Sequence, residues 1–270
     1  MRVIRRWLAV QALCAVPLGA QVAVTSPGPD LREPSYRVRA TNQPIRLDAR
    51  FSEPVWQAVD SIVDFRQREP LEGALATERT VVKVVRDGER LYVAVRAYDT
   101  DMRGVRSTQL RRDADLSSDD NITILIDSYR DRRGAFLFGT NLNGAMCDGQ
   151  LIGLDNVNEN WNGIWDVATR RDSVSWSAEF AIPLQTLRFN PGNDIIGFNL
   201  RRVIRRKNEE DLWRSWGRAQ GLVNLVNTGD IGGFSEIQGD RPIELRPYVL
   251  GRLVAPSYDS AGTRLAQSEK

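Results

Sequence analysis

Acidic residues gather around one apolar segment of the chain, within the stretch SSDDNITILIDSY at residues 117–129. Asp119 and Asp120 precede this segment, and Asp127 ends it. Carboxylates can act as a general acid and base, ligate a metal ion or solvate the ends of strands. In a straight strand that rises about 3.3 Å per residue, Asp119 and Asp127 lie roughly 26 Å apart. The carboxyl pairs of glycosidases stand about 5 to 9.5 Å apart, so these two residues cannot form such a pair.

Antiparallel pairing would collect a different set of polar side chains at one edge. The strand that ends at Asp99, the strand that starts near Asn121 and the return strand 135–142 would all meet there. The side chains at this edge would be Asp99, Asp101, Asp119, Asp120, Asn141, Asn143 and Asp148. Two interpretations stay open. Either these groups cap strand ends, or a structural calcium ion is bound, although no compact D-x-D-x-D-G loop is present. The residues predicted to ligate calcium are Asp99, Asp119, Asp120 and Asp148.

A second group of candidates surrounds Trp161, in the amide-rich segment 155–163. Asn and Asp favour a loop. An indole beside Asn160 and Asn162 can stack on the apolar face of a sugar ring while the amides bind its hydroxyls. Trp213, with Trp216 close behind it, is a second candidate for stacking. The alternative is that Trp161 folds back to seal the core and that Trp213 and Trp216 pack within the sheet.

Basic residues cluster further along the chain, at Arg201, Arg202, Arg205 and Arg206. Such a cluster can bind acidic glycans. Charge runs are more often solvated faces, however, and acidic residues follow directly after this one. The sequence therefore favours a solvated surface, with ionic ligand binding as the alternative.

Histidine is absent from the 270 residues. Its absence excludes Ser-His-Asp and Cys-His catalysis, His-ligated zinc and His-ligated haem. Loss of the three arginines in the N-terminal segment would leave slightly more acidic than basic residues in the mature chain. A nucleic-acid partner then loses its main electrostatic support and is not expected.

The N-terminal 20 residues have the layout of a secretory signal. Three arginines precede the apolar segment 7–16, which is too short to span a membrane, and small residues follow up to Ala20. We therefore expect a signal peptide over residues 1–20 and an extended, proline-containing leader over residues 21–43. Cleavage after Ala20 would leave Cys147 as the single cysteine, which excludes a disulfide bond within the chain.

Short strands dominate the rest of the sequence. Apolar and polar residues alternate as they do in half-buried strands, and Asp87-Gly88 supplies the positive φ angles of a tight hairpin turn. The clearest such segments are 81–85, 91–98, 122–126 and 174–182. Antiparallel strands without regular helical spacers predict an all-β fold, a jelly-roll-like antiparallel β-sandwich.

One short helix is expected near the start of this region, over residues 53–62. Ser52 would be its N-cap and Pro54 would lie in its first turn. Trp56 is predicted to pack beneath the helix, and Trp176, on the apolar side of its strand, is predicted to belong to the core.

Taken in order, the motifs of residues 44–240 resemble the family 9 carbohydrate-binding modules. The residues that carry the resemblance are Ile45-Arg46-Leu47-Asp48, Glu53, Trp56, Leu91 to Val95, Asp99, Asp119 to Asn121, Asp127, Asn141, Gly144, Trp176, Glu179, Ile182-Pro183, Gly197 to Asn199, Arg201 and Arg202. The resemblance implies a calcium-containing β-sandwich that binds a polysaccharide or oligosaccharide. It also implies that the module assists a glycoside hydrolase in carbohydrate breakdown.

The tail, residues 241–270, carries a second resemblance through Arg246-Pro247-Tyr248-Val249. These residues are similar to the first strand of an outer-membrane barrel domain that follows such modules in some secreted bacterial proteins. The resemblance implies a periplasmic, cell-surface or secreted domain in a Gram-negative-type bacterium. Because one strand cannot form a barrel, the chain would then be a fragment, with the barrel as its partner.

Together these features predict an exported, non-catalytic module that binds glycans by aromatic stacking and hydrogen bonds. One alternative is a periplasmic interaction domain of an outer-membrane protein without sugar binding, which would have buried loop tryptophans. The other alternative is a hydrolase acting on O-glycosyl bonds, in which Asp119, Asp120 or Glu179 would be needed for turnover. No carboxyl pair with a suitable separation supports that enzyme.

Overall fold

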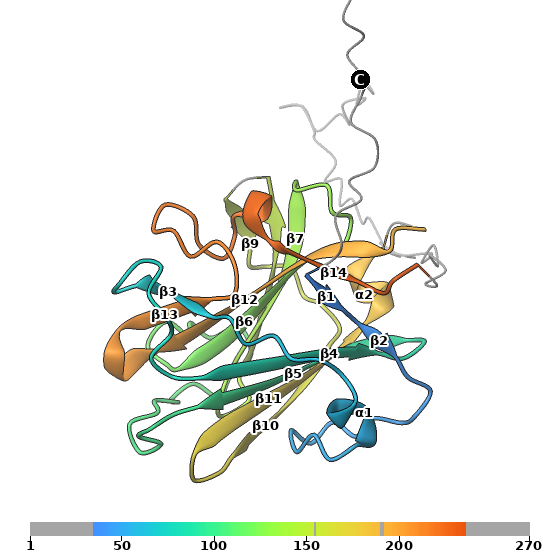
Figure 1. Cartoon of the computed structure of the whole chain (residues 1–270). Coiled ribbons are helices and arrows are strands. Elements are labelled where there is room, and N and C mark those ends of the chain that lie inside the picture. Colours follow the sequence, from blue (N-terminus) through green and yellow to red (C-terminus); the bar gives the residue numbers. More distant parts are fainter. Residues whose placement is uncertain (1–34, 154, 190–191, 236–270) are drawn as a thin grey trace, which may run out of the picture. The chain divides into compact units, whose positions relative to one another are not determined.

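The alternating apolar residues fold into two β-sheets that pack face to face (Figure 1). The computed structural model describes residues 35–153, 155–189 and 192–235. The signal peptide predicted for residues 1–20 and the tail 241–270 lie outside the described residues. The all-β sandwich predicted from the sequence is confirmed.

The larger sheet has nine strands. They are β1 (Tyr36–Arg37), β3 (Arg66–Glu69), β6 (Asn121–Asp127), β7 (Gly134–Asn141), β8 (Met146–Ile152), β9 (Asn156–Asn158), β12 (Ile195–Ile204), β13 (Glu209–Leu212) and β14 (Gly229–Gly232). Their order is β1-β14-β12-β6-β7-β8-β9, while β13 pairs with β12 and β3. Neighbouring strands are antiparallel, except that β1 runs parallel to β14.

The smaller sheet has five strands, in the order β10-β11-β5-β4-β2. They are β2 (Arg39–Ala40), β4 (Thr80–Arg86), β5 (Arg90–Tyr98), β10 (Asp166–Arg171) and β11 (Ser175–Pro183). Residues 36–40 were predicted to belong to an extended leader, yet β1 and β2 pair with one sheet each. Regular structure therefore begins before Ile45, because these residues complete the backbone hydrogen bonds of β14 and β4.

Helices are few and short: α1 (Pro54–Gln57), α2 (Leu184–Leu187), and the 3-10 turns η1 (Arg205–Lys207) and η2 (Leu225–Asn227). The helix expected over residues 53–62 is a single turn, because Ile62 already pairs with Val82 of β4. Glu53 occupies the N-cap position in place of Ser52, without a capping hydrogen bond from its side chain. Trp56 is fully buried, as predicted. None of the helices in the described ranges has the length and apolar content needed to cross a membrane.

The core between the sheets follows the alternation of the strands. Ile122, Ile124 and Ile126 of β6 pack in one cluster with Val93 and Val95 of β5. Trp176 belongs to the same cluster, which confirms its assignment to the core. The intervening residues of β6, Thr123 and Leu125, point to the outer face of the larger sheet.

Trp213 is also part of this core, and a glycine makes room for it. Its ring lies 6.0 Å from that of Phe198, and a Cβ placed on Gly229 would come within 2.2 Å of its Cζ3 atom. Gly229 pairs with Phe198 between β14 and β12. The absence of a side chain at Gly229 therefore lets the indole lie against β14.

We predict that Gly229→Ala lowers the free energy of unfolding by about 1–3 kcal/mol, because the added methyl group overpacks the contact with Trp213. Urea unfolding followed by tryptophan fluorescence measures this change. Gly88→Ala is the matched control, since nothing lies within 4 Å of its Cβ position, and it should change stability by less than about 0.5 kcal/mol. Equal stabilities of the two variants would contradict the packing described here.

Candidate functional site

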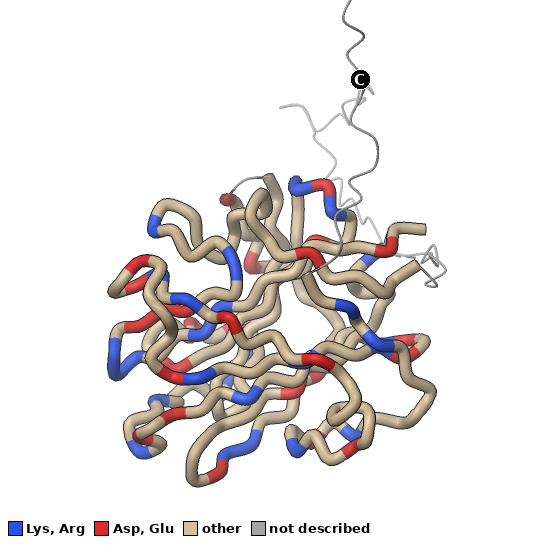
Figure 2. The backbone as a smooth tube through the Cα atoms, viewed as in Figure 1, with Lys and Arg blue, Asp and Glu red and all other residues tan. Residues whose placement is uncertain are grey.

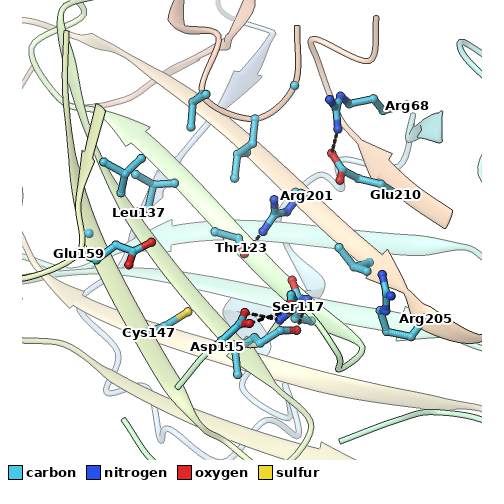
Figure 3. A pocket seen from close by; sticks show the side chains of 18 of the residues that line it. Arg68, Asp115, Ser117, Thr123, Leu137, Cys147, Glu159, Arg201, Arg205 and Glu210 are labelled. Carbon is cyan, nitrogen blue, oxygen red and sulfur yellow. Dashed lines mark hydrogen bonds and ion pairs between the residues drawn. The ribbon is translucent and has the colours of Figure 1, made fainter. Parts of the chain in front are cut away.

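A groove of about 780 Å³ lies on the outer face of the larger sheet (Figure 3). Its floor follows a row of cross-strand neighbours. Arg201 of β12 pairs with Thr123 of β6, Thr123 with Gly139 of β7, and Gly139 with Cys147 of β8. Paired residues point to the same face of a sheet. The row therefore aligns residues from four strands on the floor of the groove.

Small residues keep this part of the sheet face hollow. Gly139 has no side chain between Thr123 and Cys147, and a Cβ there would lie 2.5 Å from Cys147 Sγ. Gly149 leaves similar room beside Val157. Elsewhere on the same face, larger side chains form a cluster that includes the loop after β13: Leu125, Ala135, Leu151, Leu212, Leu222 and Leu225. The groove is the part of the face that this loop does not cover.

Charged side chains from several elements line the groove. Arg201 and Arg205 lie on the β12 side and Arg68 on β3, whereas Glu159 follows β9 on the far side (Figure 3). Basic and acidic residues lie close together in this part of the molecule (Figure 2), because β3 carries two arginines and its partner β13 carries three acidic residues. Arg68 Nη1 donates to Glu210 Oε1 at 3.1 Å. The groove is thus polar and carries charges of both signs.

Two further groups in the groove limit its chemistry. Burial raises the pKa of the half-buried Cys147 thiol to about 11, so it is protonated at neutral pH and a weak nucleophile. Asn121 donates from Nδ2 to the carbonyls of Leu116 and Asp119. Its Oδ1 is buried without a partner. The protein encloses this oxygen, so a ligand in the groove reaches it only if the surrounding side chains move.

The structure places Trp161 at the edge of the core and not in the groove. Its ring centroid lies 4.9 Å from that of Phe136 and 5.9 Å from that of Phe138, and the side chain is half-buried. Asn160 is exposed. Asn162 is also exposed, and its Oδ1 accepts a hydrogen bond from Arg112 Nε at 3.0 Å. These contacts are those of a tryptophan that seals the core, and a stacking role for Trp161 stays a prediction.

Trp213 offers even less surface to a ligand. Its side chain is 3% exposed, and the Arg214 guanidinium lies 4.3 Å from its ring centroid. Stacking of a sugar on Trp213 would require a rearrangement of this loop.

Trp216 is the second tryptophan of the stacking face that the sequence offers together with Trp213. Of the tryptophans in the described ranges, it alone is well exposed, at 39%. Arg66 lies 5.7 Å from its ring centroid. Because Arg66 and Arg68 are two residues apart on β3, they point to the same side. Arg68 lines the groove, so Trp216 lies beside that end of it. In the sequence, Trp216 stands between Ser215 and Gly217, and these two residue types favour a turn or loop. In the structure, Ser215 has a φ of 62°.

The carboxylates predicted to ligate calcium lie in three environments. Asp119 accepts hydrogen bonds from Thr108 N, Thr108 Oγ1, Gln109 N and Asn141 Nδ2, at 2.7–2.9 Å. Burial alone would raise the pKa of Asp119, but these bonds lower it. Asp119 therefore holds segment 108–109 against the end of β7.

Asp148 lies apart from the others, on β8. Arg112 Nη2 donates to it at 2.6 Å, and the Gly163 amide also donates to it. The Asp148 side chain is fully buried. It therefore ties Arg112 and the loop after β9 to the sheet.

Asp99 and Asp120 lie at the same end of the sandwich, on either side of the buried Arg202. Arg202 is 1% exposed, and its Nη2 lies 3.8 Å from Asp99 Oδ2. The charge of Arg202 also lowers the pKa of Asp120, although burial raises that pKa by more. Arg206 donates to both Asp99 and Glu78. Basic side chains therefore supply positive charge at the edge where calcium was predicted.

These residues do not suit a calcium ion. The oxygens of Asp119 and Asp148 already accept hydrogen bonds from the protein, and Asp99 is paired with two guanidinium groups. Within the described part of the chain, no group of three or more Asp, Glu or Cys side chains is arranged to hold a metal. The calcium ion stays a prediction that the arrangement of these side chains does not support.

Glu179 has a structural partner as well. It is fully buried on β11 and accepts hydrogen bonds from the amides of Asp48 and Ala49, at 3.0 and 2.8 Å. Burial raises its pKa to about 7. The carboxylate thus fastens the segment before α1 to the smaller sheet.

Comparisons with solved structures show proteins that share this fold. A family 9 carbohydrate-binding module from Caldicellulosiruptor kristjanssonii, in complexes with glucose and with cellotriose, superposes with a TM-score of 0.51 at 17% identity. It covers 78% of this chain and 98–100% of that one. A proposed carbohydrate-binding protein from Bacteroides uniformis gives a TM-score of 0.59 at 10% identity, covering 73% and 97%. These similarities show a shared β-sandwich fold.

The sequence itself supplies the family. Residues 47–226 match the family described as carbohydrate family 9 binding domain-like, and the chain belongs to this family. Among curated proteins, none matches the chain significantly.

We predict that stability falls as the pH rises from about 4 to 8. Burial, and then the nearby Glu209, raise the pKa of Asp211 to about 8 from an ordinary value of 3.8. The folded protein therefore holds a proton that the unfolded chain releases in this window, so stability is lost as pH rises. Urea unfolding across this pH range measures the slope. Asp211→Asn should flatten it, whereas Asp115→Asn, at an exposed carboxylate, should not; an unchanged slope in Asp211→Asn would contradict this account.

We also predict that calcium leaves the thermal midpoint unchanged, because Arg202 and Arg206 already compensate the buried carboxylates. Thermal unfolding in EDTA and in millimolar calcium provides the measurement. Calcium bound at 100 times its dissociation constant would stabilise the fold by about 2.7 kcal/mol. A midpoint raised by several degrees would restore the predicted calcium site.

Proposed function

We propose that this chain is a saccharide-binding module whose ligand lies in the groove on the outer face of the larger sheet. The observation that carries the proposal is the family match over residues 47–226, on a fold with an open groove of about 780 Å³. Ligand sites are commonly concave surfaces of this size that combine apolar floor with a few polar groups.

The groove offers both kinds of contact that a sugar needs. Leu137 and Val203 provide apolar floor, and the Thr123 hydroxyl provides a hydrogen-bonding group. Trp216 would supply the stacking surface at the Arg68 end of the groove. The predicted mechanism of stacking plus hydrogen bonding is therefore kept, with Trp216 in the place that Trp161 and Trp213 were expected to fill.

The wider setting remains as the sequence predicts it. We infer an exported module that assists a glycoside hydrolase, or one joined to an outer-membrane barrel. The signal peptide and the barrel-like tail lie outside the described residues. The sugar complexes of the structural relatives support a glucose-containing ligand as the first to test.

One observation favours the alternative of an interaction domain without sugar binding. That alternative predicts buried loop tryptophans, and Trp213 is buried while Trp161 packs on two phenylalanines. Acrylamide quenching of tryptophan fluorescence, with and without sugar, distinguishes the two. Under the alternative, quenching is weak and sugars do not change it, whereas a ligand that covers Trp216 would reduce it.

The direct test is isothermal titration with a panel of neutral and acidic oligosaccharides. Val203→Trp should weaken binding of any saccharide ligand at least about tenfold, because the indole fills the groove. Trp216→Ala should weaken binding about twofold to tenfold, through the loss of stacking.

Val174→Trp is the matched control for the groove variant. Val174 is exposed just before β11 of the other sheet, so this variant should bind as the parent chain does. A folded parent chain that binds no member of the panel would overturn the proposed function. Binding that Val203→Trp leaves intact would move the site away from the groove.

A further inference from the structure

The arginines of β12 separate into two groups because successive strand residues point to opposite faces. Arg202 points inward, where it donates to the carbonyls of Tyr98 and Arg79. Arg201 and Val203 point outward, and Arg205, just after the strand, lines the same groove (Figure 3). Arg202 therefore hydrogen-bonds within the fold, whereas Arg201 and Arg205 line the groove.

Arg201 and Arg205 lack acidic partners. Arg201 makes one hydrogen bond, from Nη2 to the neutral Thr123 hydroxyl at 3.3 Å. The Arg205 side chain has no hydrogen bond or ion pair among the described residues. The Nε atoms of both residues are buried without a partner. The Nη atoms of Arg205 and the Nη1 atom of Arg201 are not among the buried atoms, and they are the donors that an acceptor on a ligand can reach.

The acidic residues around the groove are mostly engaged elsewhere. Four of them pair with arginines: Glu210 with Arg68, Asp148 and Asp113 with Arg112, and Glu69 with Arg218. Two others accept hydrogen bonds from neutral groups, Glu209 from Thr77 and Asp115 from Ser117. Glu159 is without such a partner among the described residues. It follows β9, which is four strand spacings from β12, or roughly 19 Å. The β12 side therefore presents two guanidinium groups, of Arg201 and Arg205, with which no carboxylate of the described residues is paired, while Glu209 and Asp115 keep their negative charges.

We propose that the groove selects saccharides that carry carboxylate groups, such as oligomers of uronic acids, over neutral saccharides of the same shape. Guanidinium groups bind carboxylates through two parallel, charge-assisted hydrogen bonds. Arg201 and Arg205 are four residues apart, which corresponds to roughly 13 Å along a strand. They therefore meet acidic groups on two different units of an oligomer. This inference rests on the proposed saccharide binding in the groove and names its ligand class.

The test compares each acidic oligosaccharide with its carboxyl-reduced counterpart, which keeps the sugar framework and removes the charge. Fragments of oligogalacturonate, oligomannuronate and hyaluronan are titrated into the whole chain by calorimetry. At least one acidic member should bind about tenfold or more tightly than its reduced form, and added salt should weaken that binding.

Arg201→Gln and Arg205→Gln should each lower the affinity for the acidic ligand about tenfold and leave the reduced form unchanged. The matched control is Arg170→Gln, at an exposed arginine on β10 of the other sheet, which should change neither. Circular dichroism and thermal unfolding of each variant confirm that the fold is intact.

Three outcomes would overturn the inference. They are equal binding of acidic and reduced forms, acidic binding that survives both arginine substitutions, and equal binding of poly-glutamate, which carries carboxylates without sugars. Binding of neutral saccharides without a preference for acids would overturn this inference alone. A folded chain that binds no saccharide would overturn the proposed function and this inference with it.

Discussion

The buried guanidinium of Arg202 joins the two sheets at one end of the sandwich. It extends from β12 of the larger sheet and donates to Tyr98 O at 2.6 Å and to Arg79 O and Thr80 Oγ1 at 3.1 Å on the side of the smaller sheet. Its charge also compensates Asp99 and favours the ionised forms of Asp120 and Asp211, which burial opposes. A buried ion that is paired and fully hydrogen-bonded fixes a geometry, and removing one partner is costly. The register of β12, and hence which of its residues reach the outer face, depends on this arrangement.

The groove follows from that register. With Arg202 held inward, Arg201 must point outward and pair across the sheet with Thr123, in line with Gly139 and Cys147. The small residues of this row leave the face hollow, and the loop after β13 covers the rest with leucines. Strand β12 thus supplies an internal cation that joins the two sheets, and β12 and η1 supply two external cations without carboxylate partners. The family match supports the proposed saccharide ligand, and the external arginines support the proposed preference for acidic units.

Alternation along the strands could be predicted from the sequence, because one face of each strand is buried and the period is two. The inward position of Trp176 followed from the same rule. Contacts between distant segments could not be predicted: Trp161 lies on Phe136 and Phe138, and Arg202 lies among carboxylates from four other strands or loops. The charged segment after residue 200 was interpreted as a solvated face from its composition alone. Successive side chains of a strand point to opposite faces, so Arg202 is buried although Arg201 is not. The expected positive φ at Gly88 is absent, since the Asp87 carboxylate accepts from the amides of Glu89 and Arg90 and forms the turn instead.

The central claim is that a saccharide binds in the groove of the larger sheet. Backbone hydrogen exchange, measured by mass spectrometry with and without the tightest-binding oligosaccharide, tests it most directly. The account predicts slower exchange with ligand in residues 113–117, in β8 and β9, and in residues 201–223, with no change in β10 and α1. Ligand protection confined to the smaller sheet or to α1, or none at any saccharide concentration, would contradict it.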